Sequence, residues 1–256
     1  MRYQRVTLKL SGEAVSGDRD FGFDPGALEH IADQVLSLHS RGVQISIVIG
    51  GGNIFRGELG SKWGIERAEA DNIGMMGIIV NSLMLRGVLT ARSESTVEVR
   101  VMTAISVDNV AEPYIRLRAI HHLEKGYIVI FAAGTGQPYV TTDYTAAQRA
   151  LETRSEALLF AKNRARGIFT TDPHEDPEAR LYRRMHYNSI LRQNLRVVDL
   201  PSVILARDHE LPIHVFDFAE TSTIVKICDG EDLGTLVADV QDELEDSTPE
   251  HAAALR

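Results

Sequence analysis

Cysteine is nearly absent from this 256-residue sequence, in which Cys228 is the only one. A single cysteine excludes an intrachain disulfide and a cysteine-rich metal site, and this scarcity is typical of a reducing, cytoplasmic compartment. The first ten residues alternate like a strand and do not resemble a signal peptide. No apolar run approaches the roughly 20 residues needed to cross a bilayer, so we expect no membrane association.

An excess of basic residues is also missing, since the formal net charge is −9. The segment from Asp229 to Arg256 contains nine acidic residues and one basic residue, so residues 1–228 carry a net charge of only −1. The basic footprint of a nucleic-acid-binding protein is therefore absent, and nucleic acid is excluded as a partner. We predict one domain over residues 1–238, followed by an acidic, weakly ordered tail over residues 239–256.

Three common nucleotide-binding signatures are missing: the Walker pattern, Gly-x-Gly-x-x-Gly and the His-Arg-Asp loop of protein kinases. Instead, an apolar run over Ile45–Ile49 ends at three glycines, Gly50–Gly52, and Arg56 follows four residues later. Glycines leave the backbone free to adopt positive φ and let a ligand approach closely, and successive N–H groups form a nest for anionic oxygens. Arg56 can close over the same anion with its planar guanidinium. The alternative is a tight turn with a solvated arginine.

The predicted elements follow the order of an α/β protein. A strand over Val6–Leu10 precedes a helix that begins at Asp24-Pro25 and ends before Gly42, and the strand Ile45–Ile49 comes next. This strand–helix–strand order is the crossover of a parallel sheet. The sequence predicts further helices over Glu66–Ala91, Val110–Leu123, Thr141–Leu151, Ser189–Leu195 and Leu200–Asp208, and strands over Val97–Val101, Tyr127–Ala133, Ala157–Lys162, Pro212–Phe218 and Gly234–Val237.

Polar or glycine-rich loops follow three of these strands: Lys9-Leu10-Ser11-Gly12, Gly50–Gly52 and Gly134-Thr135-Gly136. In an open parallel sheet, the loops after the strands meet at one edge, where ligands bind. Lys9 and Arg56 supply positive charge there, and Asp143 can hold magnesium or fix the lysine. These residues match phosphoryl transfer, in which catalysis is mostly positioning and charge neutralisation.

Several motifs in the same order resemble those of the amino acid kinase family, and within it the bacterial uridylate kinases. The resemblance runs from about Tyr3 to Val237 and rests on Leu8–Ala14, Val48–Gly57, Asp71 with Gly74-Met75, Met102–Ile105, Ala111–Tyr114, Gly134–Gly136, Thr141–Asp143, and Gly167 with Asp172-Pro173. It implies a three-layer α/β sandwich around a mainly parallel sheet, and a homohexamer. The implied activity is Mg²⁺-dependent phosphoryl transfer from ATP to UMP in pyrimidine nucleotide biosynthesis.

The resemblance also assigns roles to individual residues. Lys9, Arg56 and Asp143 are implied as catalytic, with Lys9 bridging the transferred phosphoryl group and Asp143 ordering the lysine and the metal. The implied ATP contacts are Lys9, Leu10, Ser11, Gly12, Gly52, Arg56, Asn163, Phe169 and Asp172. The implied UMP contacts are Gly51, Asp71, Thr135, Gly136, Gln137, Pro138, Tyr139, Val140, Thr141 and Thr142.

Regulation by nucleotides is a further implication of the resemblance, with GTP activating and UTP inhibiting. The implied activator region consists of Gly17, Asp18, Phe21 and Gly22 in one loop, together with Arg86 and Arg100.

Two positions depart from the family's pattern. Arg166 stands where an acid is common, and either binds a phosphate or points to solvent, the interpretation we prefer. Gln137 stands where asparagine is frequent, which matters less in a loop that binds through its backbone.

Two other functions fit the sequence. A different kinase of the same family, acting on a carboxylate or carbamate, shares the ATP side. It is not expected to combine Asp71 with the loop Thr135–Thr142 in this form. A nucleotide-sensing relative that keeps the pocket and has lost turnover is the non-enzymatic alternative, and Arg166 is the feature that favours it.

Overall fold

The computed structural model describes residues 1–163, 165–173, 176, 178–195 and 197–245. The strands over these residues are β1 (Arg5–Leu10), β2 (Gln44–Ile49), β3 (Val99–Thr103), β4 (Glu112–Pro113), β5 (Ile128–Ala132), β6 (Ala157–Lys162), β7 (Tyr182–His186), β8 (Ile213–Asp217), β9 (Thr235–Ala238) and β10 (Glu243–Leu244). The helices are α1 (Glu13–Ser16), α2 (Pro25–His39), α3 (Gly57–Lys62), α4 (Arg67–Arg92), α5 (Arg116–Glu124), α6 (Thr142–Glu152), α7 (Tyr187–Gln193), α8 (Leu200–Asp208) and α9 (Thr223–Asp229).

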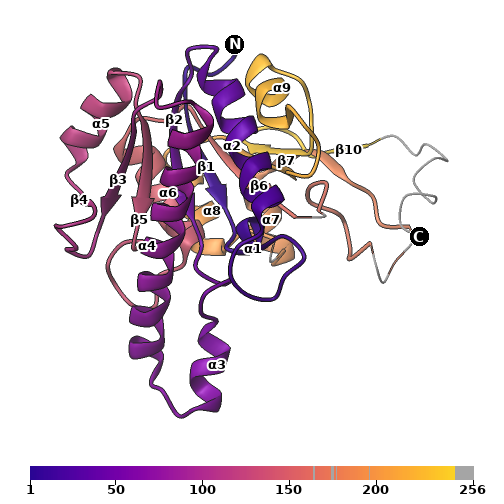
Figure 1. The fold of residues 1–256 in the computed structure, drawn as a ribbon. Coiled ribbons are helices and arrows are strands. Elements are labelled where there is room, and N and C mark those ends of the chain that lie inside the picture. The colour runs from indigo at the N-terminus through magenta and orange to yellow at the C-terminus, as the bar shows by residue number, and fades with distance from the viewer. Residues whose placement is uncertain (164, 174–175, 177, 196, 246–256) are drawn as a thin grey trace.

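The described strands form one ten-stranded sheet with helices on both faces (Figure 1). The strand order is β10-β7-β9-β8-β6-β1-β2-β5-β3-β4. The six consecutive strands in the middle of this order, β8-β6-β1-β2-β5-β3, are all parallel. Antiparallel pairing occurs between β8 and β9 and between β7 and β10. The predicted three-layer α/β sandwich around a mainly parallel sheet is confirmed.

Each face of the sheet has its own apolar core. Helices α1, α2, α4 and α9 cover one face, and α5, α6, α7 and α8 cover the other. Alternation along β1 sends Val6, Leu8 and Leu10 into the first core and leaves Thr7 and Lys9 on the opposite face, where both are buried. Lys9 therefore lies under α6, at the end of the strand where the loops gather.

Helix α2 begins where the sequence predicts. Asp24 caps α2 by accepting a hydrogen bond from the Ala27 N–H at 2.9 Å, and Pro25 occupies the first turn. The chain leaves the helix through Gly42, which has a φ of 85°. This helix packs against α4 and α9 and closes the crossover between β1 and β2.

The predicted helix over Val110–Leu123 begins too early. Glu112 and Pro113 form the short strand β4 beside β3, and α5 starts only at Arg116. Proline has no N–H to donate within a helix and disfavours a helical conformation for the residue before it. Besides β4, five short elements of the described residues were not predicted because their patterns span few residues: α1, α3, β7, α9 and β10.

Helix α4 is an exception to the expectation that no apolar run is long enough to cross a bilayer. By length and composition alone, Arg67–Arg92 is long and apolar enough to cross a bilayer. Small and polar residues within it, such as Gly77, Asn81 and Ser82, break up the apolar run in the sequence. In the structure these three are buried on the side of α4 that packs against α2, α3, β3 and β5.

The last described residues join the sheet inside the segment that the sequence assigns to the tail. Glu243–Leu244 pair with β7 as β10, and the Asp242 side chain accepts a hydrogen bond from the His186 N–H at 2.7 Å. The Glu245 N–H donates to the Leu181 carbonyl at 2.8 Å. Residues 246–256 lie outside the described residues, so the prediction of weak order there stays a prediction.

Candidate active site

Lys9 and Asp143 form a short buried ion pair at the end of β1. The Lys9 Nζ lies 2.5 Å from Asp143 Oδ1. Asp143 is in the first turn of α6, which Thr141 caps by accepting a hydrogen bond from the Tyr144 N–H at 3.1 Å. The other carboxylate oxygen of Asp143 accepts the Asp199 N–H at 3.2 Å. The carboxylate is therefore held from two sides, and it fixes the ammonium group at the rim of the sheet.

A second lysine, Lys162, lies near the same carboxylate, at the end of β6 beside β1. The Nζ atoms of Lys9 and Lys162 each lie 5.8 Å from the centre of the Phe160 ring. Burial lowers the pKa of Lys162, Asp143 raises it, and the charge of Lys9 lowers it again, with a net decrease. Burial by itself raises the pKa of Asp143, but the two lysines and the hydrogen bonds leave it below the ordinary value. The cluster thus holds two ammonium groups for one carboxylate.

Gly12 and Gly51, in the loops after β1 and β2, are required for space. A Cβ on Gly12 would lie 2.6 Å from the Gly52 nitrogen, and one on Gly51 would lie 2.7 Å from the Gly74 carbonyl oxygen. None of Gly50, Gly51 and Gly52 adopts the positive φ that glycine allows. The backbones of β1, β2 and α4 approach one another too closely for any side chain.

Two buried asparagines hold Gly50–Gly52, here called the glycine loop, in place. The side-chain amides of Asn53 and Asn81 donate to each other's oxygens at 3.1 and 2.6 Å. Asn81 also donates to the Gly50 carbonyl at 2.7 Å, and Asn53 donates to the Gly22 carbonyl at 2.9 Å. The sequence reasoning missed this pair, because Asn81 looks like one polar position in an amphipathic helix.

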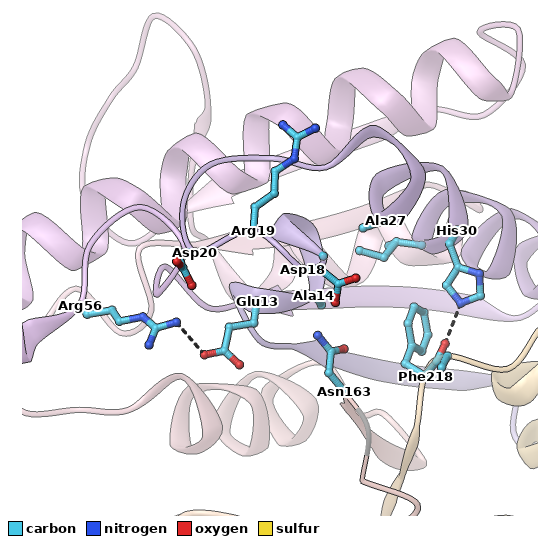
Figure 2. A pocket seen from close by; sticks show the side chains of 13 residues that line it. Glu13, Ala14, Asp18, Arg19, Asp20, Ala27, His30, Arg56, Asn163 and Phe218 are labelled. Atoms are coloured by element: carbon cyan, nitrogen blue, oxygen red, sulfur yellow. Dashed lines mark hydrogen bonds and ion pairs between the residues drawn. The ribbon is translucent and has the colours of Figure 1, made fainter. Parts of the chain in front are cut away.

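A cavity of about 510 Å³ opens on one side of the glycine loop (Figure 2). Arg56 lines it and donates to Glu13 Oε1 at 3.1 Å and to the Gly52 carbonyl at 3.4 Å. Asn163, at the end of β6, lines the same cavity. This larger cavity, here called the donor cavity, thus collects charged and amide groups beside the strand ends.

A smaller cavity of about 160 Å³, here called the acceptor cavity, lies on the other side of the loop, where Gly51, Gly52, Asp71, Gln137 and Val140 line it. The carboxylate of Asp71 accepts hydrogen bonds from Arg67 Nε at 2.8 Å and from the Tyr139 N–H at 2.8 Å. The second bond joins α4 to the loop after β5. The two segments that the resemblance assigns to UMP are therefore brought together.

The loop after β5 needs its two glycines for conformation. Gly134 and Gly136 have φ values of 58° and 77°, in the left-handed region that glycine adopts most easily. Between them, the Thr135 hydroxyl is buried and has no hydrogen-bond partner among the described residues. A buried hydroxyl without a partner costs free energy, so a ligand atom placed there would be stabilising. Pro138, Thr141 and Thr142 continue this loop into α6.

A model of the amino acid kinase family matches residues 4–217. The chain belongs to the amino acid kinase family. It is 51% identical to the uridylate kinase of Frankia alni over 236 residues, which cover 92% of this chain and 91% of that protein. The crystal structure of UMP kinase from Bacillus anthracis matches with a TM-score of 0.93 and 54% identity, covering 96% of this chain and all of the other. UMP kinase from Ureaplasma parvum matches with a TM-score of 0.86 and 33% identity, over 93% of this chain and all of the other.

The resemblance to the amino acid kinase family is thus confirmed, and the remaining predicted site residues of this family member can be placed. Leu10 and Ser11 lead from β1 into α1: the Leu10 carbonyl accepts the Gly50 N–H at 2.9 Å, and the Ser11 hydroxyl accepts the Ala14 N–H at 3.3 Å. Phe169 forms a bridge with Leu181 beside β7. Phe169 and Asp172 are not among the described residues that line the donor cavity.

The residues predicted to bind an activator fall into two places. Gly17 and Asp18 line the donor cavity. Arg86 and Arg100 line a separate cavity of about 550 Å³ between the end of α4 and the strands β3 and β4. Within one chain, the structure does not bring the loop and the two arginines together. Phe21 is largely exposed, and the Gly22 N–H donates to the Asn53 carbonyl at 2.9 Å.

Arg166 is half exposed, and its guanidinium lies 3.6 Å from the Glu245 carboxylate. It is not among the described residues that line the donor cavity. Of the two interpretations, the structure favours an arginine at the surface, next to the end of the described chain. The next residue, Gly167, packs so closely on β9 that a Cβ on it would lie 2.5 Å from the Thr235 hydroxyl oxygen.

Metal-binding side chains are sparse. Over the part of the chain that the structure describes, no three His, Cys, Asp or Glu side chains gather closely enough to hold a metal ion. Asp143 lies at the end of β1 and already contacts Lys9 and the Asp199 N–H. A metal ion at this site would take most of its ligands from a bound nucleotide and water.

Proposed function

We propose that this chain transfers the γ-phosphoryl group of ATP to UMP, giving ADP and UDP. The observation that carries the proposal is the pair of cavities on opposite sides of the glycine loop. Gly52 lines the acceptor cavity, and its carbonyl accepts a hydrogen bond from Arg56, which lines the donor cavity. Ligands in the two cavities would therefore meet at the loop. The relatives named uridylate kinase and UMP kinase support these substrates.

Charge neutralisation is the main task of the site. ATP and UMP are both polyanions, and their repulsion must be offset before the phosphoryl group can move. Lys9, Lys162 and Arg56 supply fixed positive charge, and backbone N–H groups of the glycine loop add neutral donors. A general base is not needed, because the second pKa of a phosphate monoester is about 6 and the UMP phosphate is largely dianionic at pH 7.

The acceptor cavity has groups suited to a nucleoside. We expect the Asp71 carboxylate to accept hydrogen bonds from ribose hydroxyls, since it already lies at the cavity wall and is held by Arg67 and the Tyr139 N–H. The Gln137 amide, which lines the cavity, would satisfy polar atoms of the acceptor. The buried Thr135 hydroxyl lies in the same loop, two residues before Gln137, and has no hydrogen-bond partner among the described residues. In this proposal, Asp71 binds and does not take part in proton transfer.

We further propose that Mg²⁺ enters with ATP. Magnesium typically binds through one or two carboxylates together with substrate phosphates and water, and Asp143, beside Lys9, is placed to supply one of them. When bound, the ion would neutralise charge on the transferred phosphoryl group and the leaving group. Asp143 itself fixes Lys9 and offsets the charge of Lys162, so its contribution does not depend on the metal alone.

Regulation and assembly belong to the same proposal. The cavity with Arg86 and Arg100 has a volume that fits a nucleotide, and arginine pairs well with phosphate, which supports activation by GTP. Inhibition by UTP follows from the family resemblance.

The exposed apolar face of α4, formed by Met76, Val80 and Met84, supports self-association, for which we propose a homohexamer. The single buried cysteine fits a cytoplasmic enzyme of pyrimidine nucleotide biosynthesis.

A coupled assay of ADP release tests the proposal. The purified chain is incubated with ATP and Mg²⁺ and one acceptor at a time: UMP, CMP, GMP, aspartate, glutamate or carbamate, with and without GTP. We expect UMP to give the highest kcat/KM and GTP to raise it. Faster turnover with a carboxylate or carbamate would indicate the other kinase class. Tight UMP binding by calorimetry without ADP formation would indicate a sensor.

A further inference from the structure

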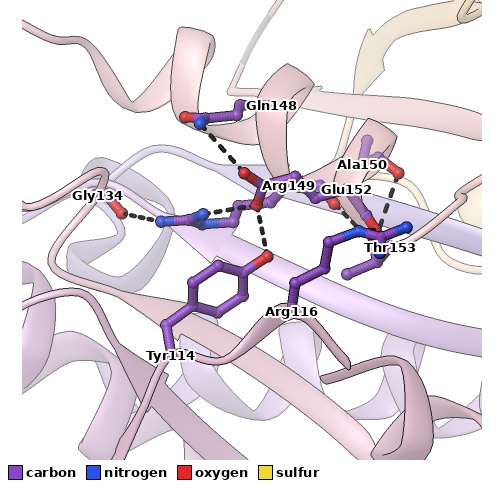
Figure 3. A network of polar contacts seen from close by, with 8 residues as sticks. All are labelled: Tyr114, Arg116, Gly134, Gln148, Arg149, Ala150, Glu152 and Thr153. Carbon is purple, nitrogen blue, oxygen red and sulfur yellow. Dashed lines mark hydrogen bonds and ion pairs between the residues drawn. The ribbon is translucent and has the colours of Figure 1, made fainter. Parts of the chain in front are cut away.

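A buried arginine on α6 reaches back to the loop that borders the acceptor cavity (Figure 3). Arg149 is 5% exposed, and its Nη2 donates to the Gly134 carbonyl at 3.3 Å. Its Nη1 lies 2.6 Å from Glu152 Oε2, one turn further along the helix. The same helix carries Asp143 at its other end. One rigid element therefore contacts both the lysine cluster and the loop after β5.

A tyrosine from a distant segment completes the support of this arginine. The Tyr114 ring lies under the guanidinium, with Arg149 Cζ 3.7 Å from the ring centre, and its hydroxyl donates to Glu152. The ring also packs edge-on against Phe131 of β5 at 5.5 Å. Burial raises the pKa of Tyr114, and the hydrogen bond to Glu152 raises it further, so the phenol remains a donor at neutral pH.

This arrangement controls the orientation of one peptide group in the loop. The Gly134 carbonyl and the Thr135 N–H belong to the same planar trans peptide and point in opposite directions. When Arg149 holds the carbonyl on one side, the N–H is turned to the other. Gly134 has a φ of 58°, and its backbone is freer than that of other residues, so this peptide needs an external contact to keep one orientation.

We propose that Arg149, supported by Glu152 and Tyr114, is a positioning residue that sets the Gly134–Gly136 loop for binding of the acceptor nucleotide. This inference rests on the proposed function, because it assigns UMP to the acceptor cavity. A charged donor on the Gly134 carbonyl polarises the peptide and makes the Thr135 N–H a stronger donor. Arg149, Glu152 and Tyr114 are not among the described residues that line the acceptor cavity, so they act through the loop. Gly134–Gly136 do not line it either, but the next residue, Gln137, does.

Two conservative variants test the proposal by steady-state kinetics with UMP and ATP varied separately. Arg149→Lys keeps a positive charge for Glu152 but loses the fork that reaches Gly134, and Tyr114→Phe keeps the ring and loses only the hydroxyl. For Arg149→Lys we expect the KM for UMP to rise about 10-fold, and for Tyr114→Phe about 3-fold, as for the loss of one hydrogen bond. The KM for ATP and kcat should change less than about 2-fold, because the donor cavity is untouched.

Arg116→Lys is the matched control. Arg116 donates to the backbone carbonyl of Glu152 at 2.7 Å, but it is exposed and does not contact the loop. Its KM for UMP should equal that of the wild type. A melting temperature that falls in Arg149→Lys or Tyr114→Phe with an unchanged KM for UMP would show a purely structural role and overturn the proposal.

Calorimetric binding of UMP separates this inference from the proposed function. If the wild type binds UMP but forms no ADP, the proposed function fails, and weaker binding by Arg149→Lys still supports the positioning role. If the wild type turns UMP over and the variants bind it equally well, the positioning role fails alone. A wild type that neither binds nor phosphorylates UMP contradicts both.

Discussion

The ammonium group of Lys9 lies 2.5 Å from the carboxylate of Asp143, although 134 residues separate them in the chain. The contact exists because β1 lies next to β6 and beneath α6, at the edge of the sheet where the loops meet. Lys162 approaches the same carboxylate from β6. Positive charge is therefore concentrated and held rigidly at the place where two anionic ligands would meet.

Lys9→Ala should reduce kcat by about 10²- to 10³-fold, the usual effect of removing one group that stabilises transition-state charge. The KM for UMP should change little, because Lys9 does not line the acceptor cavity among the described residues. Steady-state assays with UMP varied check this. Lys125→Ala, at an exposed lysine after α5, is the control and should retain the wild-type kcat. A near-normal kcat in Lys9→Ala would remove this residue from the mechanism.

Asp143→Asn should destabilise the fold as well as abolish activity. Removing the carboxylate leaves Lys9 and Lys162 buried without an opposite charge, and breaking a buried pair costs about 3–5 kcal/mol. Thermal unfolding should show a melting temperature about 10 °C lower. Asp33→Asn is the matched control: Asp33 pairs with Arg92 at 2.7 Å on the surface, where such pairs contribute little. Equal melting temperatures for the two variants would contradict the role assigned to Asp143.

Asp71→Asn should raise the KM for UMP about 10-fold and leave the KM for ATP unchanged, because a charged acceptor in the acceptor cavity becomes a neutral amide. Initial rates with each nucleotide varied in turn measure this split. Glu69→Gln, at an exposed acid in the first turn of the same helix, is the control. If the KM for ATP rises as much as the KM for UMP, Asp71 does not act specifically on UMP, and the assignment is wrong.

His214 should make the fold less stable in mild acid. It is buried, with Nε2 3.0 Å from the Tyr3 hydroxyl, and burial together with the charge of Arg2 lowers its pKa to about 4, with Asp232 opposing. The unfolded chain binds a proton near pH 6.5 and the folded chain does not, so the free energy of unfolding falls as pH drops from 6.5 toward 4. The full loss is about 3 kcal/mol.

Urea unfolding at pH 7.5, 5.5 and 4.5 checks this pH dependence. The wild type and His209→Gln, at an exposed histidine, should lose stability in parallel. His214→Gln should start from a lower stability and lose about 2–3 kcal/mol less between the highest and the lowest pH. Identical slopes in all three proteins would rule out His214 as a source of acid sensitivity.

Val80→Glu should reduce the assembled mass measured by light scattering. Val80 is 45% exposed and lies between Met76 and Met84 on the apolar face of α4, where a charge would oppose burial against another copy. Ile204→Glu, on the exposed side of α8 at 41%, is the matched control. If both variants keep the mass of the wild type, self-association through α4 is excluded.

The sequence alone determined much of this protein, wherever the signal lies in adjacent residues. The alternation of β1 predicted its two faces, Asp24-Pro25 predicted the start of α2, and the motifs from Leu8 to Pro173 predicted the family. These features depend on local periodicity, capping and turn chemistry, which a short window of sequence contains.

Only the tertiary structure decided which distant residues act together. The sequence could not show that Lys162 joins Lys9, that Asn53 pairs with Asn81, or that Arg149 reaches Gly134, because each contact follows from the strand order and from the way α4 and α6 pack. It also could not tell that Gly50 and Gly51 serve close approach and not positive φ. The physical reason is that these contacts depend on distances between backbones that no local pattern sets.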